Sequence, residues 1–308
     1  MRRDTGLDFW GFRAAFAAVL WFAASPAIAA DLSPSAGLKE EVPGPLSGWS
    51  MSFTPYGWLT FLDGSVTVKG RTADLNINPV TVLEHLERMP WFSYLEARNG
   101  PISFYNDVIY ANLGGVASGV KSFDRIDATI SGSAKLDATM AIVEFGGTYE
   151  LARWASAGSL KDPNAPASFT AIDVLAGARY WYQSTSLNLA IAGSVPPDLT
   201  PTPGGAIARS GSVDWVDPLV GLRLRHEFEP GRELILRADI GGFGAGSEFS
   251  WNALAAYRIE IASKNGYTYS GIIGYRALQA DYVQGEARTR YEWDVVQHGP
   301  IIGLSVGF

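Results

Sequence analysis

From Gly48 onward the chain alternates apolar and polar residues with a period of two, and this pattern constrains its fold most strongly. In residues 49–61 the odd positions are mostly apolar, whereas the even positions carry mainly Ser and Thr. Residues 248–261 repeat the pattern. A period of two is typical of β-strands, whose successive side chains point to opposite faces. Soluble sheets prefer strands of about five or six residues. These stretches are longer, and their apolar faces end in aromatic residues, which predicts the lipid-facing strands of a membrane β-barrel.

The N-terminus has the pattern of a cleavable export signal. Arg2, Arg3 and Arg13 precede an apolar run over residues 14–24, and the small-residue sequence 27–30 follows. The apolar run is shorter than the about 20 residues that a membrane-spanning helix needs. We therefore expect residues 1–30 to be a signal peptide, cleaved after Ala29 or Ala30. Residues 31–47 are then a periplasmic N-terminal extension, and 48–308 form the barrel.

The C-terminal strand supports an outer-membrane location in a Gram-negative bacterium. Apolar residues alternate up to an aromatic last residue, as in the C-terminal assembly signal of bacterial outer-membrane proteins. This resemblance implies recognition by the outer-membrane insertion machinery. The residues assigned to the signal are Ile302, Leu304, Val306 and Phe308.

Turn residues predict the number of strands. Short glycine-containing turns lie at 99–101, 230–232 and 264–266, and counting back from the last strand places all three on the periplasmic side. We read residues 48–68 as one strand that bends near Asp63-Gly64, followed by a short returning segment over 72–78. The predicted fold is all-β: a closed antiparallel transmembrane β-barrel of about ten strands. Twelve is the alternative if the 115–130 or 186–206 regions pair as strands.

One segment departs from period two. Residues 79–88 begin with Pro79 and place Val80, Leu83 and Leu86 at helical spacing, which predicts one short helix. It would be either a loop helix on the rim of the barrel or a lid over its mouth.

Charged residues occupy inward-facing positions of nearly every strand, and positive and negative residues are nearly equal in number. An unpaired charge inside a narrow barrel is costly, so we expect a paired network, which would also form a candidate constriction for a narrow polar path. Glu150 and Glu227 also occupy inward-facing positions. The candidate constriction comprises Glu96, Arg98, Asp107, Glu144, Asp173, Arg179, Arg223, Arg225, Arg237, Asp239, Arg258, Glu260 and Arg276.

Composition and motifs argue against several other functions. The net charge of −7 argues against nucleic acid as a partner. The chain has no cysteine and three histidines, His85, His226 and His298, at no metal-ligand spacing. No phosphate-binding loop or hydrolase motif appears. We therefore expect no catalytic residue, no metal and no cofactor.

Several segments resemble a group of poorly characterised proteobacterial outer-membrane β-barrel proteins, similar in build to porin-like and OmpA- or OmpW-like small barrels. They are 55–59, 70–74, 94–98, 177–181, 241–244 and 298–300. The resemblance implies fold and location, and no catalytic residue transfers with it.

The expected function is that of a non-enzymatic barrel, structural or serving as a narrow channel. Its expected partners are outer-membrane lipids, the insertion machinery and small polar solutes. Two alternatives stay open: a rim-active outer-membrane enzyme that cleaves proteins or modifies lipids, and a surface binding or adhesion protein that uses mobile loops at 114–127 and 192–210.

Overall fold

A closed ring of antiparallel strands forms the fold of the computed structural model, which describes residues 48–68, 70–123, 128–155, 168–194 and 205–308. β1 (Trp49–Trp58) pairs with β4 (Trp91–Asn99) on one side and with β12 (Tyr291–Gly307) on the other, which closes the ring. The other ring strands each pair with their neighbours in sequence: β5 (Ile102–Phe123), β6 (Ala128–Ala155), β7 (Phe169–Ser194), β8 (Gly205–Glu229), β9 (Arg232–Gly241), β10 (Phe249–Lys264) and β11 (Tyr267–Gln284). The prediction of a ten-stranded closed barrel is confirmed. The proposed signal peptide and the 31–47 extension lie outside the described residues.

The region predicted as one strand over 48–68 is divided. β1 ends at Trp58, and β2 (Phe61–Val68) pairs with the first half of β12, residues 291–298, whereas β1 pairs with its second half. The interruption falls at Leu59 and Thr60, before the predicted bend at Asp63-Gly64, where Gly64 has φ +142°. At this level Gly299 of β12 has φ +154°, and a Cβ there would lie 1.9 Å from the Leu59 carbonyl oxygen. Only glycine lets these two backbone segments approach so closely at the point where β12 changes its partner from β2 to β1.

The returning segment forms β3 (Arg71–Ile77), which pairs with β2 as an added hairpin, as predicted. The short helix is present as α2 (Pro79–Glu84), where the side chain of Asn78 accepts a hydrogen bond from the Thr81 amide at 3.0 Å. The helix is shorter than the predicted 79–88, because the chain after it forms backbone hydrogen bonds to β5, including the Leu86–Leu113 bridge. Of the helices described, none is long and apolar enough to cross a membrane.

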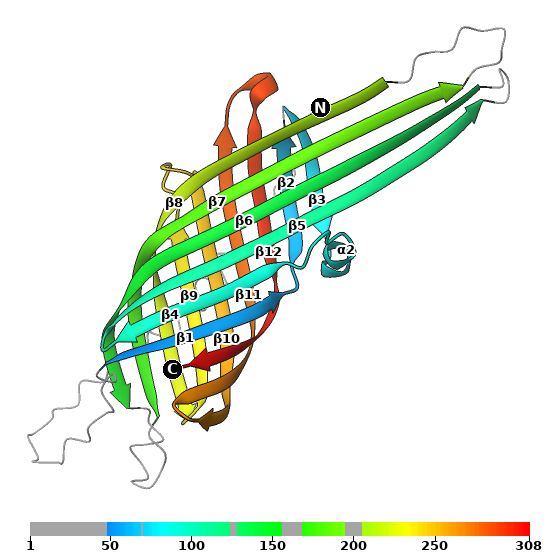
Figure 1. The fold of residues 1–308 in the computed structure, drawn as a ribbon. Helices are drawn as coiled ribbons and strands as arrows, with labels where there is room; N and C mark the ends of the chain where they lie inside the picture. The colour runs from blue at the N-terminus through cyan, green and yellow to red at the C-terminus, as the bar shows by residue number, and fades with distance from the viewer. Residues whose placement is uncertain (1–47, 69, 124–127, 156–167, 195–204) are drawn as a thin grey trace, which may run out of the picture. The chain divides into compact units, whose positions relative to one another are not determined.

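Four neighbouring strands, β5 to β8, extend well past the strands beside them (Figure 1). β6 has 28 residues, whereas β9 has 10. Residues within the expected loops 114–127 and 192–210 therefore lie in strands: β5 reaches Phe123 and β8 begins at Gly205. For the described residues of these regions the prediction of loops was wrong, and so was the idea that the regions add two separate strands, while residues 124–127 and 195–204 lie outside the described part of the chain. The described residues extend the four strands because backbone pairing continues along them. β5 and β6, for example, stay in register as far as Phe123 and Ala128.

The outer surface of the ring is apolar, as a membrane-embedded barrel requires. Exposed side chains there include Phe145, Leu222, Ile273, Ile302 and Leu304. The three short turns and the C-terminus lie at one end, since Trp49 pairs with Asn99 and Thr268 pairs with Gly307. Short turns are typical of the periplasmic end. The structure is that of an outer-membrane β-barrel, in agreement with the sequence.

Candidate functional site

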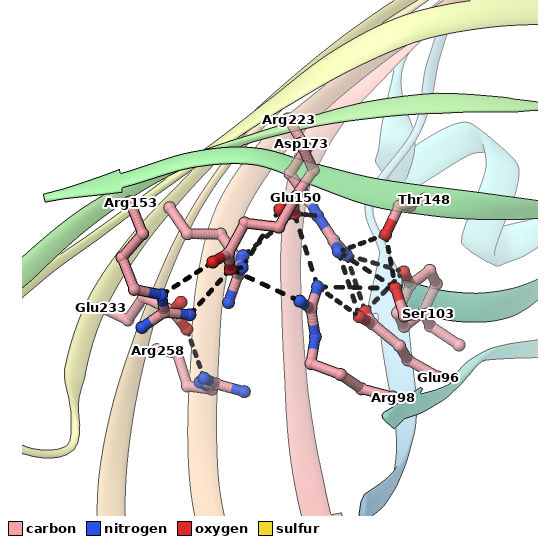
Figure 2. A network of polar contacts seen from close by, with 12 residues as sticks. Glu96, Arg98, Ser103, Thr148, Glu150, Arg153, Asp173, Arg223, Glu233 and Arg258 are labelled. Carbon is pink, nitrogen blue, oxygen red and sulfur yellow. Dashed lines mark hydrogen bonds and ion pairs between the residues drawn. The ribbon is translucent and has the colours of Figure 1, made fainter. Parts of the chain in front are cut away.

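The interior of the barrel holds a charge network centred on Asp173 of β7, whose side chain is fully buried. Its Oδ2 accepts hydrogen bonds from Nε of Arg223 at 2.8 Å and from Nε of Arg225 at 3.0 Å. Arg223 also donates to Glu96 at 2.7 Å (Figure 2). Arg225 donates to Glu150 at 2.6 Å. The network therefore joins β4, β6, β7 and β8.

Two further arginines complete this set. Arg98 lies 3.2 Å from Glu96 and 3.5 Å from Asp173, and Arg153 lies 2.8 Å from Glu150. We call the seven charged residues the Asp173 network: Glu96, Arg98, Glu150, Arg153, Asp173, Arg223 and Arg225.

A second network lies further along the bore and is more deeply buried. Arg179 of β7 contacts Glu144 at 2.7 Å and Asp239 at 2.6 Å, and the exposed fraction of each of these side chains is 0–1%. Arg237 pairs with the same two acids, and Arg276 pairs with Asp107 at 2.5 Å. The three arginines and three acids of this set balance in charge, and each of them pairs with an opposite charge of the set. We call this set the Glu144 network: Asp107, Glu144, Arg179, Arg237, Asp239 and Arg276.

Tyrosines link the two networks. The Tyr94 hydroxyl donates to Glu96 at 3.0 Å, and its ring stacks on Tyr105 at 6.0 Å. The guanidinium of Arg237 lies 4.8 Å from the centre of the Tyr105 ring. Gly146 makes room for this arrangement, because a Cβ there would lie 2.7 Å from the Tyr105 hydroxyl.

Aromatic side chains fill the bore beyond the Glu144 network. Trp215 stacks on Trp181 at 5.5 Å and on Tyr282 at 4.0 Å. The Trp181 indole donates to Asp217 at 3.0 Å, and the Trp215 indole donates to Ser247 at 2.8 Å. Their polar atoms are therefore satisfied, as large buried indoles require.

These layers follow one another along the strands. Inward positions of β7 carry Asp173 first, then Arg179, then Trp181, and all three are fully buried. A water-filled channel would leave such side chains accessible to solvent. Paired charges and stacked rings therefore occupy the interior of the barrel at three successive levels.

The structure places every predicted constriction residue except Glu260 inside the barrel, within ion-pairing distance of an opposite charge. Glu260 is exposed beside the Pro230-Gly231 turn, so its assignment to the network was wrong. Glu260 occupies an inward-facing position by alternation, but it lies at the end of the barrel, beside the turn that joins β8 to β9. Arg258 pairs with Glu233 instead. Glu227 accepts a hydrogen bond from the Gly231 amide at 3.0 Å, in the same turn. Whether the set acts as a constriction stays a prediction.

Sequence reasoning missed three buried or half-buried charges. Glu233 and Asp217 occupy inward-facing positions on β9 and β8, the strands that carry the predicted residues Arg237 and Arg223. The alternation of inward and outward positions could therefore have identified them. Arg153 could not be found this way. A β-bulge between Glu150 and Ala152 adds a residue to β6, which turns Arg153 inward where strict alternation would point it outward.

The four residues assigned to the assembly signal lie on the last strand and its end. Ile302, Leu304 and Phe308 are exposed, at 64%, 63% and 52%. Ser305, of opposite parity, is buried and accepts a hydrogen bond from Thr54 at 2.9 Å. The apolar face of the strand therefore points outward, and its recognition by the insertion machinery stays a prediction.

The histidines lie outside both networks. His85 and His226 contact Thr81 and Thr170 respectively. His298 lies on the outer face of the barrel between Tyr275, whose hydroxyl is 2.6 Å from Nδ1, and Asp63, whose Oδ2 is 2.9 Å from Nε2. Within the described part of the chain, no group of three or more His, Asp or Glu side chains could hold a metal ion.

Comparisons with known proteins add little to this geometry. No family model and no curated protein matches the chain. Solved structures similar to it include a FadL homologue from Pseudomonas aeruginosa, at 7% identity and a TM-score of 0.29, covering 84% of this chain and 90% of that one. OccK1 (OpdK) from the same organism is similar at 8% identity and a TM-score of 0.22, over 86% and 100% of the two chains. The CymD monoaromatic hydrocarbon channel is similar at 8% identity and a TM-score of 0.23, over 85% and 88%.

At these TM-scores the similarities carry no argument about this chain. The assignment of the fold as an outer-membrane barrel rests on the strand pairing and the apolar outer surface of this protein. The comparisons also give no support that is specific to OmpA or OmpW.

Proposed function

We propose that this protein is a non-enzymatic outer-membrane barrel with a narrow, charge-lined path for small polar solutes, and that paired charges keep the path closed in the conformation described. The observation that carries this proposal is the burial of Arg179, which pairs inside the barrel with Glu144 on the adjacent strand β6 and with Asp239 on β9, two strands away. Passage of a solute would require these pairs to part, so we expect the parent barrel to conduct slowly.

Planar-bilayer conductance of the refolded barrel tests the proposal. The double variant Glu144→Ala/Arg179→Ala removes one acid and one base together, so the remaining charges of the Glu144 network still balance. The matched control is Glu229→Ala/Arg232→Ala, which removes an exposed pair 2.7 Å apart at the β8–β9 turn.

We expect low conductance for the parent and the control, and a clear increase for the variant at the Glu144 network. A large steady conductance of the parent would contradict the closed bore. No increase in the variant, if it folds, would contradict the path.

A lipid-modifying enzyme is the second candidate, because Tyr275, His298 and Asp63 form a continuous hydrogen-bonded chain on the outer face. A hydroxyl, an imidazole and a carboxylate in this order resemble the arrangement that activates a nucleophile. Incubating the barrel with phospholipid and measuring lyso-phospholipid separates the candidates. Product formation that is lost in His298→Ala would favour the enzyme.

A further inference from the structure

A groove of about 690 Å³ lies on the outer surface of the barrel, across β10, β11, β12 and β1. Glycines leave it hollow, since Gly57 and Gly271 carry no side chain where their neighbours project outward. The projecting lining residues are apolar: Pro55, Tyr257, Ile259, Ile273, Ile302 and Leu304. This surface faces the bilayer, so its natural occupant is the acyl chain of a lipid.

The hydrogen-bonded chain of Tyr275, His298 and Asp63 borders this groove on the side away from the short turns. Tyr275 follows the groove residue Ile273 by two positions on β11, and both side chains point outward. His298 precedes Phe308 by ten positions. At a rise of about 3.3 Å per residue and a tilt of about 40°, this spacing spans about 25 Å, the height of the apolar band. The polar chain therefore lies at the outer membrane interface, where a lipid head group begins.

The chemistry of this polar chain selects the head group. When Nε2 of His298 donates to Asp63, Nδ1 accepts from the Tyr275 hydroxyl, so the donors of the chain are used internally. The free lone pairs on Tyr275 and the second carboxylate oxygen of Asp63 are acceptors. Asp294 and Asp281 lie opposite each other on the same outer face, which makes the local charge negative.

We propose that the groove and the Tyr275–His298–Asp63 chain form one lipid-binding site. The acyl chain lies in the groove, and a cationic, hydrogen-bond-donating head group such as an ammonium contacts Asp63 and Tyr275. The site is on the outside of the barrel and does not depend on the proposed path through the bore.

Native mass spectrometry of the detergent-solubilised barrel, incubated with phosphatidylethanolamine or phosphatidylglycerol, tests the site. Gly271→Leu fills the groove, and its Cβ would lie 3.6 Å from Ile261, which is ordinary contact. Asp63→Asn removes the charge at the head-group end. Ala176→Leu on β7 is the matched control, because Ala176 is an exposed outward position away from the groove.

We expect the parent to retain one phosphatidylethanolamine at least tenfold more often than phosphatidylglycerol. Gly271→Leu should lose tenfold or more of the bound lipid of both kinds, Asp63→Asn should lose mainly the preference, and Ala176→Leu should match the parent. Equal retention of the two lipids by the parent, or unchanged binding in Gly271→Leu, would overturn the site. A parent that forms lipid-free dimers broken by Gly271→Leu would instead assign the groove to a second copy of the chain.

Discussion

Arg223 on β8 and Glu96 on β4 are 127 positions apart in the sequence, yet Nη1 of the arginine lies 2.7 Å from Oε2 of the glutamate inside the barrel. Such a contact joins opposite parts of the wall through the bore. It links side chains that backbone pairing does not bring together, so it stabilises the closed ring as well as filling it. Because both partners are largely buried, the loss of either leaves a charge that water cannot easily solvate.

Arg237→Ala should lower the stability of the barrel and raise the conductance of the path through its bore. Arg237 lies between Glu144 and Asp239, so its removal leaves the Glu144 network with one excess negative charge. Leaving a buried charge unpaired costs about 3–5 kcal/mol, and Arg179 still pairs with both acids, so we expect the lower end of that range. Thermal unfolding and single-channel conductance of the refolded barrel measure the two effects. Arg232→Ala, at an exposed turn, is the control, and indistinguishable behaviour of the two variants would argue against the network.

Gln297→Met should make the barrel more stable. The side chain is fully buried, and neither amide atom has a hydrogen-bond partner among the described residues. A buried polar group without a partner costs about 1–3 kcal/mol, which an apolar side chain of similar shape would recover. Chemical denaturation of the refolded barrel measures the gain. Gln279→Met is the comparison, since Gln279 donates to Asp294 at 2.9 Å and should lose stability or stay unchanged.

Phe308→Asp should slow assembly. Phe308 is half-exposed, and its amide and carbonyl exchange hydrogen bonds with Met51 where the ring closes. A charge here would disrupt the apolar face that we expect the insertion machinery to recognise. Pulse-chase measurement of heat-modifiable, folded protein in cells follows the rate. Ser305→Ala removes only a buried hydroxyl on the other face and should assemble at the parent rate. Equal delays in both variants would argue against recognition through the outward face.

The mature chain should begin at Ala30 or Asp31 and fractionate with the outer membrane. The reason is that residues 1–30 have the pattern of an export signal, with an apolar run shorter than a membrane-spanning helix needs. N-terminal sequencing of the protein from the outer-membrane fraction gives the answer. Recovery of the intact N-terminus in the inner membrane would contradict it.

The sequence by itself determined the barrel, a size of about ten strands and the direction of most side chains. This was possible because the period of a strand is two, so one apolar face also identifies the inward one. Asp173, Arg179 and Arg237 were placed inside from this parity alone, and the short turns at 99–101, 230–232 and 264–266 oriented the barrel.

Only the tertiary structure decided which charges pair. Partners such as Arg223 and Glu96 meet across the bore, and that meeting depends on the tilt and stagger of all the intervening strands. Arg153 turned inward because of a bulge that local alternation does not reveal, and Glu260 stayed outside because the wall ends at its level. The hydrogen-bonded series from Tyr275 to His298 to Asp63 likewise requires β2 to lie beside β12, which brings together residues 235 positions apart in the sequence.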